Sequence, residues 1–252
     1  MAKQNREPEN EEIGKDLCDL ARLLTDEGLC MDASFLDSAG KVCAKIPGDN
    51  KWKYSFAKLD FSLDEVGSTI PADASEIILR FSININGKTE EAGKICDPLD
   101  WLAFDIEVLG QYYHEPSDEI RDMYCSWHLD RHISVQGDGE NKFSHPLYHF
   151  AFGGKKMEEK GLDFGSTLIL PSPRFAYPPM DAVLGIDFII KNYIHRDKIK
   201  KLTRNPDYIR IIKNSQIRLW LPYSKSMYSY WDKLGHTYSD GFDHKAVFPF
   251  YI

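Results

Sequence analysis

Long apolar runs are missing from this sequence. No stretch approaches the roughly 20 apolar residues that a membrane-spanning helix needs, and the first residues lack the apolar core of a secretory signal. The most apolar segment, Ala182 to Ile194, is broken by Asp187, Lys191 and Asn192. We therefore expect a soluble, cytoplasmic protein that does not bind a membrane.

Cysteine is scarce and has no paired pattern. The five cysteines are odd in number and scattered, and no two of them form a C-x-x-C pair. This argues against both a disulfide framework and a cysteine-based zinc site. We expect most of the thiols to be reduced and buried, because free cysteine usually packs as a small hydrophobe. Cys125 as a nucleophile is the alternative, but on the strand inferred below it points away from His128.

No complete catalytic motif is present. Asp163-Phe164-Gly165 matches the metal-binding triplet of kinases, but there is no glycine-rich nucleotide loop. Gly153-Gly154-Lys155 lacks the earlier glycine of a phosphate-binding loop. His132-Ile133-Ser134-Val135 matches one element of the two-histidine phosphoesterases, without a second copy that carries the hydroxyl. We interpret all three as coincidences.

What the sequence does hold is a concentration of histidine. Half of its eight histidines lie in two short stretches, 127–132 and 145–150. In both stretches the apolar residues alternate with the polar ones, which predicts two strands with the apolar residues on one face. Gly137-Asp138-Gly139 between them indicates a hairpin loop. The opposite face then carries one carboxylate and four imidazoles, from His128, Asp130, His132, His145 and His149.

The cross-strand partners depend on the register of this hairpin. If Asp130 lies opposite Leu147, then His128 faces His149 and His132 faces His145. A slip of one residue would break both pairs, because neighbouring positions of a strand point to opposite faces.

Two kinds of chemistry fit this face, and five residues are candidates for catalysis: His128, Asp130, His132, His145 and His149. Neutral imidazoles on adjacent strands can share a divalent metal such as zinc, with His128 and His149 as the candidate ligands and Asp130 assisting. Same-face positions lie about 7 Å apart along a strand, so one metal cannot collect all four histidines. Without a metal, one histidine oriented by Asp130 would be a general base for phosphoester or acyl hydrolysis.

Two further interpretations of the same face need no reaction. The histidines can simply cover a half-exposed sheet, bonded to backbone groups or to Asp130. They can also form a pH-sensitive switch, because neighbouring imidazoles repel one another once they are protonated at about pH 6.

The N-terminal half reads as a helix followed by strands. Apolar residues at helical spacing predict a helix over 11–27 that ends at Gly28. Ser38-Ala39-Gly40, at the centre of 34–46, indicates a hairpin. Strict alternation predicts strands over 52–56, 77–85 and 102–108, and the second of these is expected to stop at the turn dipeptide Asn86-Gly87.

The C-terminal half turns helical. A strand over 167–170 is followed by a proline-rich corner over 171–179. Pro179 and Asp181 then favour the start of a helix that runs to Ile194. Asn205-Pro206 predicts the start of a second helix through Ile209, Ile212 and Ile217. We expect a short third helix over 226–234, and a tail over 236–252 that is irregular or ends in a strand over 247–250.

Strands grouped before helices define the fold class. We predict an α+β fold: an antiparallel β-sheet built from consecutive hairpins, with an N-terminal helix and C-terminal helices packed to one side. Residues 1–10 are expected to form a flexible tail and residues 11–252 a single α+β domain, with a sub-division near 64–75 as the alternative.

This order of elements resembles the topology of ubiquitin-conjugating and RWD-type domains over Ser75 to Leu219. Catalytic members of that family need a cysteine shortly after a His-Pro element. This chain has His145-Pro146, but no cysteine follows Cys125. The resemblance therefore implies an inactive module that serves interactions rather than a conjugating enzyme.

Charge is unevenly distributed along the chain. The whole sequence carries −8, which argues against unspecific coating of nucleic acid. The segment 191–218 holds nine basic and two acidic residues, a net charge of +7, so the remainder carries −15. Tyr193, Tyr208 and Trp220 lie in or beside this segment. It predicts a basic helical face that binds a protein partner or nucleic acid through Lys198, Lys200, Lys201, Arg204, Arg210 and Lys213. A solvated helix face is the alternative.

Three functions remain open at this point. The first is an intracellular interaction or accessory protein that binds a macromolecular partner through the basic face. The second is a metal-dependent hydrolase that acts on a phosphoester through the histidine face. The third is the inactive conjugating-enzyme-like module. Whether the chain is an enzyme, and in what oligomeric state it exists, the sequence leaves open.

Overall fold

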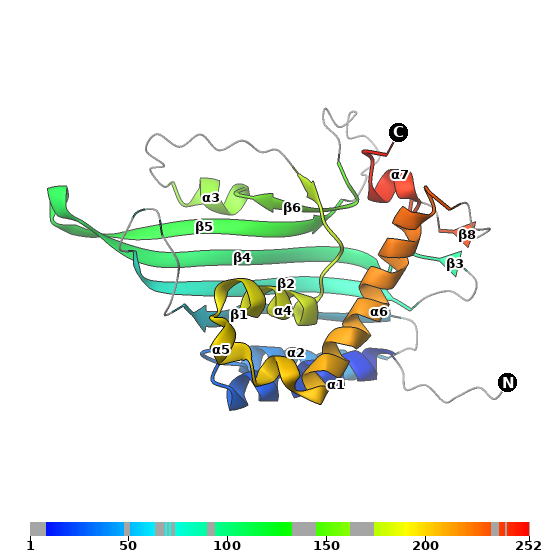
Figure 1. The fold of residues 1–252 in the computed structure, drawn as a ribbon, viewed down its shortest axis with the longest axis horizontal. Coiled ribbons are helices and arrows are strands. Elements are labelled where there is room, and N and C mark those ends of the chain that lie inside the picture. Colours follow the sequence, from blue (N-terminus) through cyan, green and yellow to red (C-terminus); the bar gives the residue numbers. More distant parts are fainter. Residues whose placement is uncertain are drawn as a thin grey trace.

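A six-stranded antiparallel sheet forms the centre of the molecule (Figure 1). Its strand order is β1-β2-β4-β5-β6-β7, so that most neighbours in the sheet are also neighbours in the chain. The computed structural model describes residues 9–47, 51–63, 69, 71, 74–89, 94–132, 145–161, 174–232, 237–239 and 241–251. The predicted α+β class, with an N-terminal helix and C-terminal helices, is confirmed.

The strands differ greatly in length, and β4 is the longest. The bounds are β1 Lys51–Ser62, β2 Ser75–Lys88, β3 Lys94–Ile95, β4 Leu99–His114, β5 Glu119–Arg131, β6 Tyr148–Phe152, β7 Phe175–Ala176 and β8 Thr237–Tyr238. β3 and β8 pair with each other in a separate parallel ladder.

The helices group at the two ends of the chain, apart from the short α3. Their bounds are α1 Glu9–Asp26, α2 Ser34–Ala44, α3 Lys155–Glu159, α4 Ala182–Tyr193, α5 Arg196–Ile199, α6 Pro206–Tyr228 and α7 His244–Val247, with 3-10 turns at Glu115–Ser117 and Leu202–Arg204. Figure 1 shows α4 and α6 in front of the sheet and α1 and α2 below β1. None of the helices in the described ranges is long and apolar enough to cross a membrane.

Helix boundaries follow the capping residues. The Asn205 side chain accepts hydrogen bonds from the backbone N–H groups of Asp207 and Tyr208, which confirms the predicted start of α6. Asp181 caps α4 in the same way through Leu184, so that helix begins after Asp181 rather than at Pro179. α1 already includes Asn10, which we placed in the tail and which donates to the Ile46 carbonyl.

The hairpin predicted over 34–46 is wrong, because these residues form the helix α2. Its buried residues Leu36, Ala39, Gly40 and Cys43 recur every three or four positions, which is a helical spacing. Gly40 serves the packing of this helix rather than a turn. A Cβ atom there would lie 2.6 Å from the carbonyl oxygen of Gly14, so α1 and α2 approach each other closely.

The turn predicted at Asn86-Gly87 is also wrong. Both residues remain in β2, where Gly87 pairs with Trp52 on β1 and Leu99 on β4. A Cβ atom on Gly87 would lie 2.3 Å from the Pro98 carbonyl oxygen and 2.5 Å from the Trp52 ring. Glycine is needed here for close packing inside the sheet, not for a reversal of the chain.

The C-terminal region differs in three respects. α6 continues through Pro222 to Tyr228, so there is no separate third helix over the described part of 226–234. It does include Ile209, Ile212 and Ile217, but Ile209 and Ile217 are exposed. α7 ends at Val247 and the described residues 248–251 are irregular, so of the two predictions for this tail the strand over 247–250 is wrong. The strand predicted over 167–170 and most of the sub-division near 64–75 lie outside the described residues.

The two faces of the sheet have different surroundings. Phe81, Phe104 and Leu129 are fully buried on the face that α4 covers. On the same face Phe150 of β6 packs against Phe188 of α4, with ring centroids 5.7 Å apart. The opposite face carries the polar residues that alternate with these apolar ones along each strand, as is usual for antiparallel sheets with one face toward water.

Candidate functional site

The five predicted site residues come together in one pocket. It has a volume of about 470 Å³ and lies on the sheet face opposite α4. His128 and Asp130 stand on β5 and His149 on β6, while His132 and His145 flank the ends of these two strands. The prediction that these side chains share one face is therefore confirmed. We call this site the histidine pocket, lined by His128, Asp130, His132, His145 and His149.

The predicted register of the two histidine strands is wrong by two residues. β5 and β6 pair antiparallel with Asp130 opposite His149 and His128 opposite Ala151, instead of Asp130 opposite Leu147. Because side chains alternate with a period of two, a shift by two positions changes the partners but keeps every side chain on its face. The shift places the carboxylate, rather than a second imidazole, directly across from His149.

Asp97 fixes this register from outside the hairpin. The Arg131 guanidinium lies 2.9 Å from one Asp97 carboxylate oxygen, and the Tyr148 hydroxyl donates to the other. Arg131 and Tyr148 stand directly opposite each other on β5 and β6. All three residues are largely buried, and a buried carboxylate needs such partners. The observed pairing satisfies all three polar groups at once.

The side chains of the pocket form a continuous row of contacts. The rings of His132 and His145 lie 4.0 Å apart between centroids, and those of His145 and His149 lie 4.6 Å apart. His149 Nε2 is 4.0 Å from Asp130 Oδ2, and His128 Nε2 is 3.4 Å from the same oxygen. His132 and His145 thus meet as predicted, whereas His128 meets His149 only through Asp130.

The tautomer of His149 follows from its other ring nitrogen. His149 Nδ1 lies 3.3 Å from the Pro146 carbonyl oxygen, which can only accept a hydrogen bond. Nδ1 therefore carries the proton, and in the neutral ring Nε2 presents its lone pair toward Asp130. The 4.0 Å gap between Nε2 and the carboxylate suits a bridging water, which can donate a hydrogen bond to each of these two acceptors.

Burial and mutual repulsion keep two of the imidazoles neutral. Desolvation, together with the neighbouring His145, lowers the pKa of His149 to about 4. Desolvation, with His132 and Arg174 acting in the same direction, lowers the pKa of His145 to about 4. Desolvation raises the pKa of the Asp130 carboxyl, an effect that His128 opposes. Near pH 7 the pocket therefore contains at least two uncharged imidazoles, whose unprotonated nitrogens can accept hydrogen bonds.

Eight of the described residues that line the pocket were not among the predicted site residues, and two of them bear on its chemistry. Arg174, from the proline-rich corner, brings a positive charge into the pocket. No pattern around Arg174 signals this, because its place depends on how the corner packs. Trp101 of β4 also lines the pocket. For Trp101 a signal existed: it is an aromatic residue on the same side of the alternation as Asp105, which is the polar side of that strand.

The structure gives the predicted metal ligands no support. His128 and His149 do face the same carboxylate oxygen, as a shared site would require. Over the described residues, however, no group of three or more His, Cys, Asp or Glu side chains is placed so as to hold a metal ion. Zinc binding by His128 and His149 stays a prediction.

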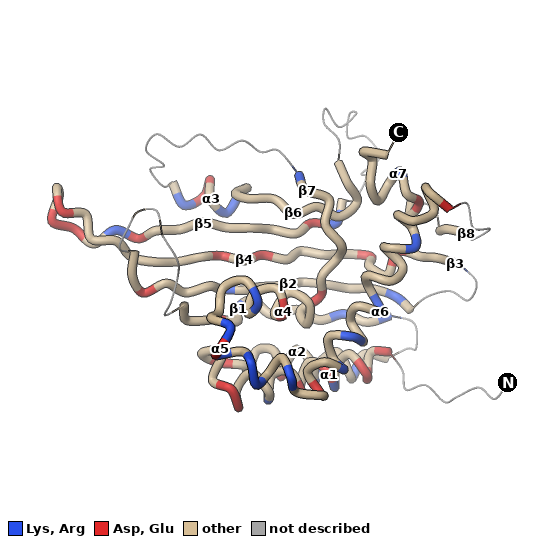
Figure 2. The backbone as a smooth tube through the Cα atoms, viewed as in Figure 1, with Lys and Arg blue, Asp and Glu red and all other residues tan. Residues whose placement is uncertain are grey.

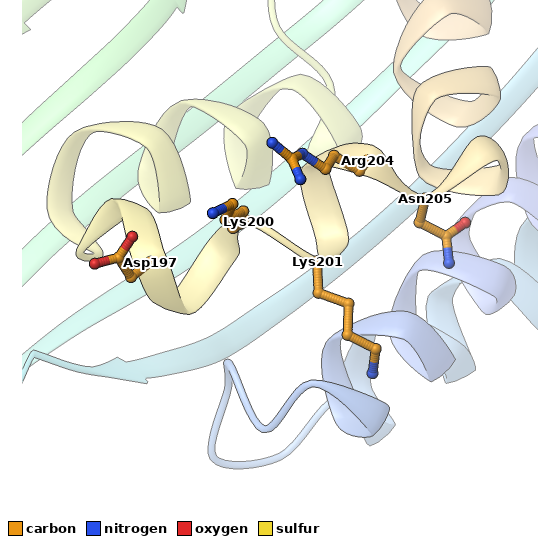
Figure 3. A pocket seen from close by; sticks show the side chains of 5 residues that line it. All are labelled: Asp197, Lys200, Lys201, Arg204 and Asn205. Carbon is orange, nitrogen blue, oxygen red and sulfur yellow. The ribbon is translucent and has the colours of Figure 1, made fainter.

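The basic segment lies on the other side of the molecule's centre, along α5 and the start of α6 (Figure 2). Lys200 and Arg204 line an open hollow of about 600 Å³ together with Asp197, Lys201 and Asn205. Figure 3 shows Lys200 and Arg204 extending to the same side, while Lys201 points away from them. Lys213 is exposed further along α6, and Lys198 lines a neighbouring hollow.

Some of these basic residues are paired with carboxylates on or beside α1. Arg210 lies 2.6 Å from the buried carboxylate of Asp16, and Lys201 lies 2.7 Å from Glu27, both on or beside α1. The aromatic residues expected beside the basic face are turned inward instead. Tyr208 is buried and donates to Asp187, and the Trp220 indole donates to the Pro179 carbonyl. Over the described residues, Lys200, Arg204 and Lys213 form no ion pair.

Comparison with known proteins gives no relative for this chain: no family model, no curated protein and no solved structure matches it.

Proposed function

We propose that the histidine pocket is the acid–base centre of a hydrolase that acts on a phosphoester. One observation carries the proposal: the Asp130 carboxylate stands between the ring nitrogens of His128 and His149, in a pocket that Arg174 also lines. A carboxylate that orients an imidazole, next to a cation that can bind an anion, is the combination that general-base hydrolysis of a phosphoester needs.

The residues take different parts in this chemistry. Asp130 accepts a hydrogen bond from the Nε2–H of His128, and this leaves the lone pair of His128 Nδ1 as the proton acceptor. The hydrogen bond from His149 Nδ1 to the Pro146 carbonyl leaves a lone pair on Nε2, which accepts a hydrogen bond from a water that bridges it to Asp130. Arg174 binds the phosphate oxygens, because a guanidinium matches their geometry and charge. His145 and His132 complete the wall of the pocket and support the His149 ring.

The reaction is the transfer of a phosphoryl group to water. The water oxygen bonds to phosphorus while its proton passes to His128, and the phosphorus–oxygen bond to the alcohol breaks. The leaving oxygen takes a proton from water, and His128 returns its proton to solvent. For a phosphomonoester the products are the alcohol and inorganic phosphate.

The test is hydrolysis of para-nitrophenyl phosphate by protein purified without a histidine tag. We expect His128→Asn and Asp130→Asn each to lower the rate at least 100-fold, because a positioned general base contributes at least that factor. His195→Asn is the matched control, since His195 is an exposed histidine at the start of α5. It should leave the rate unchanged.

Two results would contradict the proposal: no hydrolysis of any phosphomonoester by the wild-type protein, or equal rates in the wild type and His128→Asn. Elemental analysis of the same preparation, and the assay repeated with a chelator, test the metal-dependent version. If the wild-type protein holds stoichiometric zinc and the double variant with His128→Asn and His149→Asn holds none, these two residues are metal ligands instead.

The hollow beside Lys200 and Arg204 favours a second candidate function, the binding of an acidic macromolecular partner. Both side chains point to the same side of the hollow, and neither is paired with a carboxylate in the described part of the chain. A partner that replaces solvent around two such cations would bind in a salt-dependent way.

Reversal of charge tests this second function. Lys200→Glu together with Arg204→Glu should abolish salt-sensitive capture of an acidic protein or of a nucleic acid. Lys201→Glu is a weaker change by this account, because Lys201 is already paired with Glu27. Binding that does not respond to salt, or that survives the double reversal, would speak against it.

A further inference from the structure

We infer that the histidine pocket takes a nucleoside phosphate, with the base stacked on Trp101 and the phosphate held by Arg174 beside the histidines. This inference rests on the proposed phosphoester hydrolysis and names its substrate class. It is carried by the position and exposure of one aromatic side chain that the folding of the sheet does not explain.

Trp101 belongs to the pocket face by register. On β4, Ala103 pairs with Asp130 of β5, and Trp101 precedes Ala103 by two residues. Two residues along a strand return a side chain to the same face, about 7 Å away. Trp101 therefore stands on the same face as Asp130, at the end of the row where His132 lies, and both residues line the pocket.

Four aromatic residues on strands of the sheet are exposed, Trp101, Tyr113, Phe152 and Phe175, and of these only Trp101 and Phe152 line the pocket. Trp52, Phe81 and Phe104 are buried, whereas Trp101 is 43% exposed on the polar face. A large indole at this place contributes less to the core than the same residue on the α4 side, since much of its apolar surface stays in water. An exposed indole face beside a cation-lined pocket is what binding of a base requires, because every base can stack on an aromatic ring.

Volume and charge agree with this ligand. A pocket of about 470 Å³ lies within the range of small-ligand sites, and it has an aromatic wall at one end and polar groups beside it. Arg174 supplies the positive charge that a phosphate needs, whereas His145 and His149 stay uncharged near pH 7. A nucleoside phosphate offers a flat ring and an anion in one molecule, so it matches both parts.

Binding is measured by isothermal titration calorimetry in the His128→Asn variant, which slows turnover at least 100-fold, and tryptophan fluorescence is recorded beside it. The three probes are adenosine 5′-monophosphate, ribose 5-phosphate and adenosine. We expect the monophosphate to quench fluorescence and to bind about tenfold more tightly than ribose 5-phosphate, which lacks the base. Trp101→Leu should remove this difference, and Trp101→Phe should retain part of it, because a phenyl ring still stacks. The affinity for a single-stranded RNA tetranucleotide is measured in parallel. Comparison with the affinity for the monophosphate distinguishes a nucleotide within RNA from a free nucleotide.

The control is Trp231→Phe, which removes a more exposed indole, 68% accessible, that does not line the pocket. Its affinities should equal those of the parent. Equal binding of adenosine monophosphate and ribose 5-phosphate would overturn the nucleotide inference and leave the phosphoester proposal intact. Equal binding of adenosine and its monophosphate would overturn phosphate recognition, and with it the proposed function. No binding of any probe would overturn both.

Discussion

His149 shows how a single side chain sets the chemistry of the pocket. Its ring is 3% exposed, its Nδ1 is held by the Pro146 carbonyl, and its Nε2 points toward a carboxylate. Burial without a direct ionic partner disfavours the charged form, which is the cause of its low pKa. The same residue therefore accepts a hydrogen bond from water in the proposed function and is a source of acid sensitivity in stability.

The acid sensitivity gives a prediction on stability. The folded state holds His149 neutral down to its pKa of about 4, whereas the unfolded chain takes up the proton near 6.5. The stability contribution of the neutral ring is therefore present above pH 6.5 and is lost as the pH falls toward 4. It amounts to at most about 3 kcal/mol over this interval. Urea unfolding at pH 7 and pH 4.5 measures it.

The comparison needs a variant that cannot titrate. His149→Gln should lose less stability than the wild type between the two pH values, whereas the exposed His195→Gln should behave as the wild type does. If the wild type and His149→Gln show the same pH dependence, the neutral buried state of His149 is contradicted.

At the scale of the elements, the two histidine strands show what alternation can and cannot predict. Alternation assigned each side chain of 127–132 and 145–150 to a face, and the structure confirms the faces. The register depends on Asp97, which bonds Arg131 and Tyr148 from a segment more than 30 residues before them. No local pattern within the hairpin contains that information, so the partners of Asp130 were predicted wrongly.

The prediction of a hairpin where the structure has α2 failed for a different reason. Ser38-Ala39-Gly40 resembles a turn when it is read alone, but the four buried residues of 34–44 follow a helical period. Position 40 needs a glycine because α1 packs closely against it. The glycine that it contacts, Gly14, lies 26 positions earlier in the chain. A glycine selected by a distant contact cannot be distinguished from a turn glycine by its immediate neighbours.

This contact gives a prediction for Gly40→Ala. Alanine normally stabilises a helix by up to about 1 kcal/mol relative to glycine. Here its Cβ would meet the Gly14 carbonyl oxygen at 2.6 Å, so the helices must separate. We expect a net loss of about 1–3 kcal/mol in the free energy of unfolding. Gly110→Ala is the control, because its Cβ meets neighbours only at 3.4 Å. Stabilisation by Gly40→Ala would contradict the packing of α1 on α2.

For the molecule as a whole, the cations of the segment 191–218 fall into two groups, those paired with carboxylates and those exposed to solvent. Acidic residues of α1 neutralise Arg210 of α6, whereas Lys200 and Lys213 of the same segment are exposed. The sequence predicted the excess of positive charge in 191–218 but not its division, because pairing with Asp16 depends on the packing of α1 against α6. Arg174 was missed for a similar reason, since only the folded corner brings it to the pocket.

The division of charge predicts that substitutions at Arg210 and Lys213 of α6 differ in their effect on stability. Arg210→Gln leaves the buried Asp16 carboxylate with Asn214 as its remaining hydrogen-bond partner in the described residues, and should cost about 2 kcal/mol of stability. Lys213→Gln should change stability by less than about 0.5 kcal/mol, because Lys213 is exposed and has no ion pair in the part of the chain described. Thermal unfolding at low salt compares the two. Equal losses would contradict the assignment of Arg210 to the fold.

The central claim is that His128, His132, His145 and His149 form one site for a phosphoester. Histidine-resolved NMR at pH 7, titrated with phenylphosphonate, whose carbon–phosphorus bond resists hydrolysis, tests it most directly. The account predicts that the ring signals of these four histidines shift together with one dissociation constant, while those of His114, His195 and His244 stay in place. Unchanged pocket signals, or equal shifts at His114, His195 and His244, would contradict it.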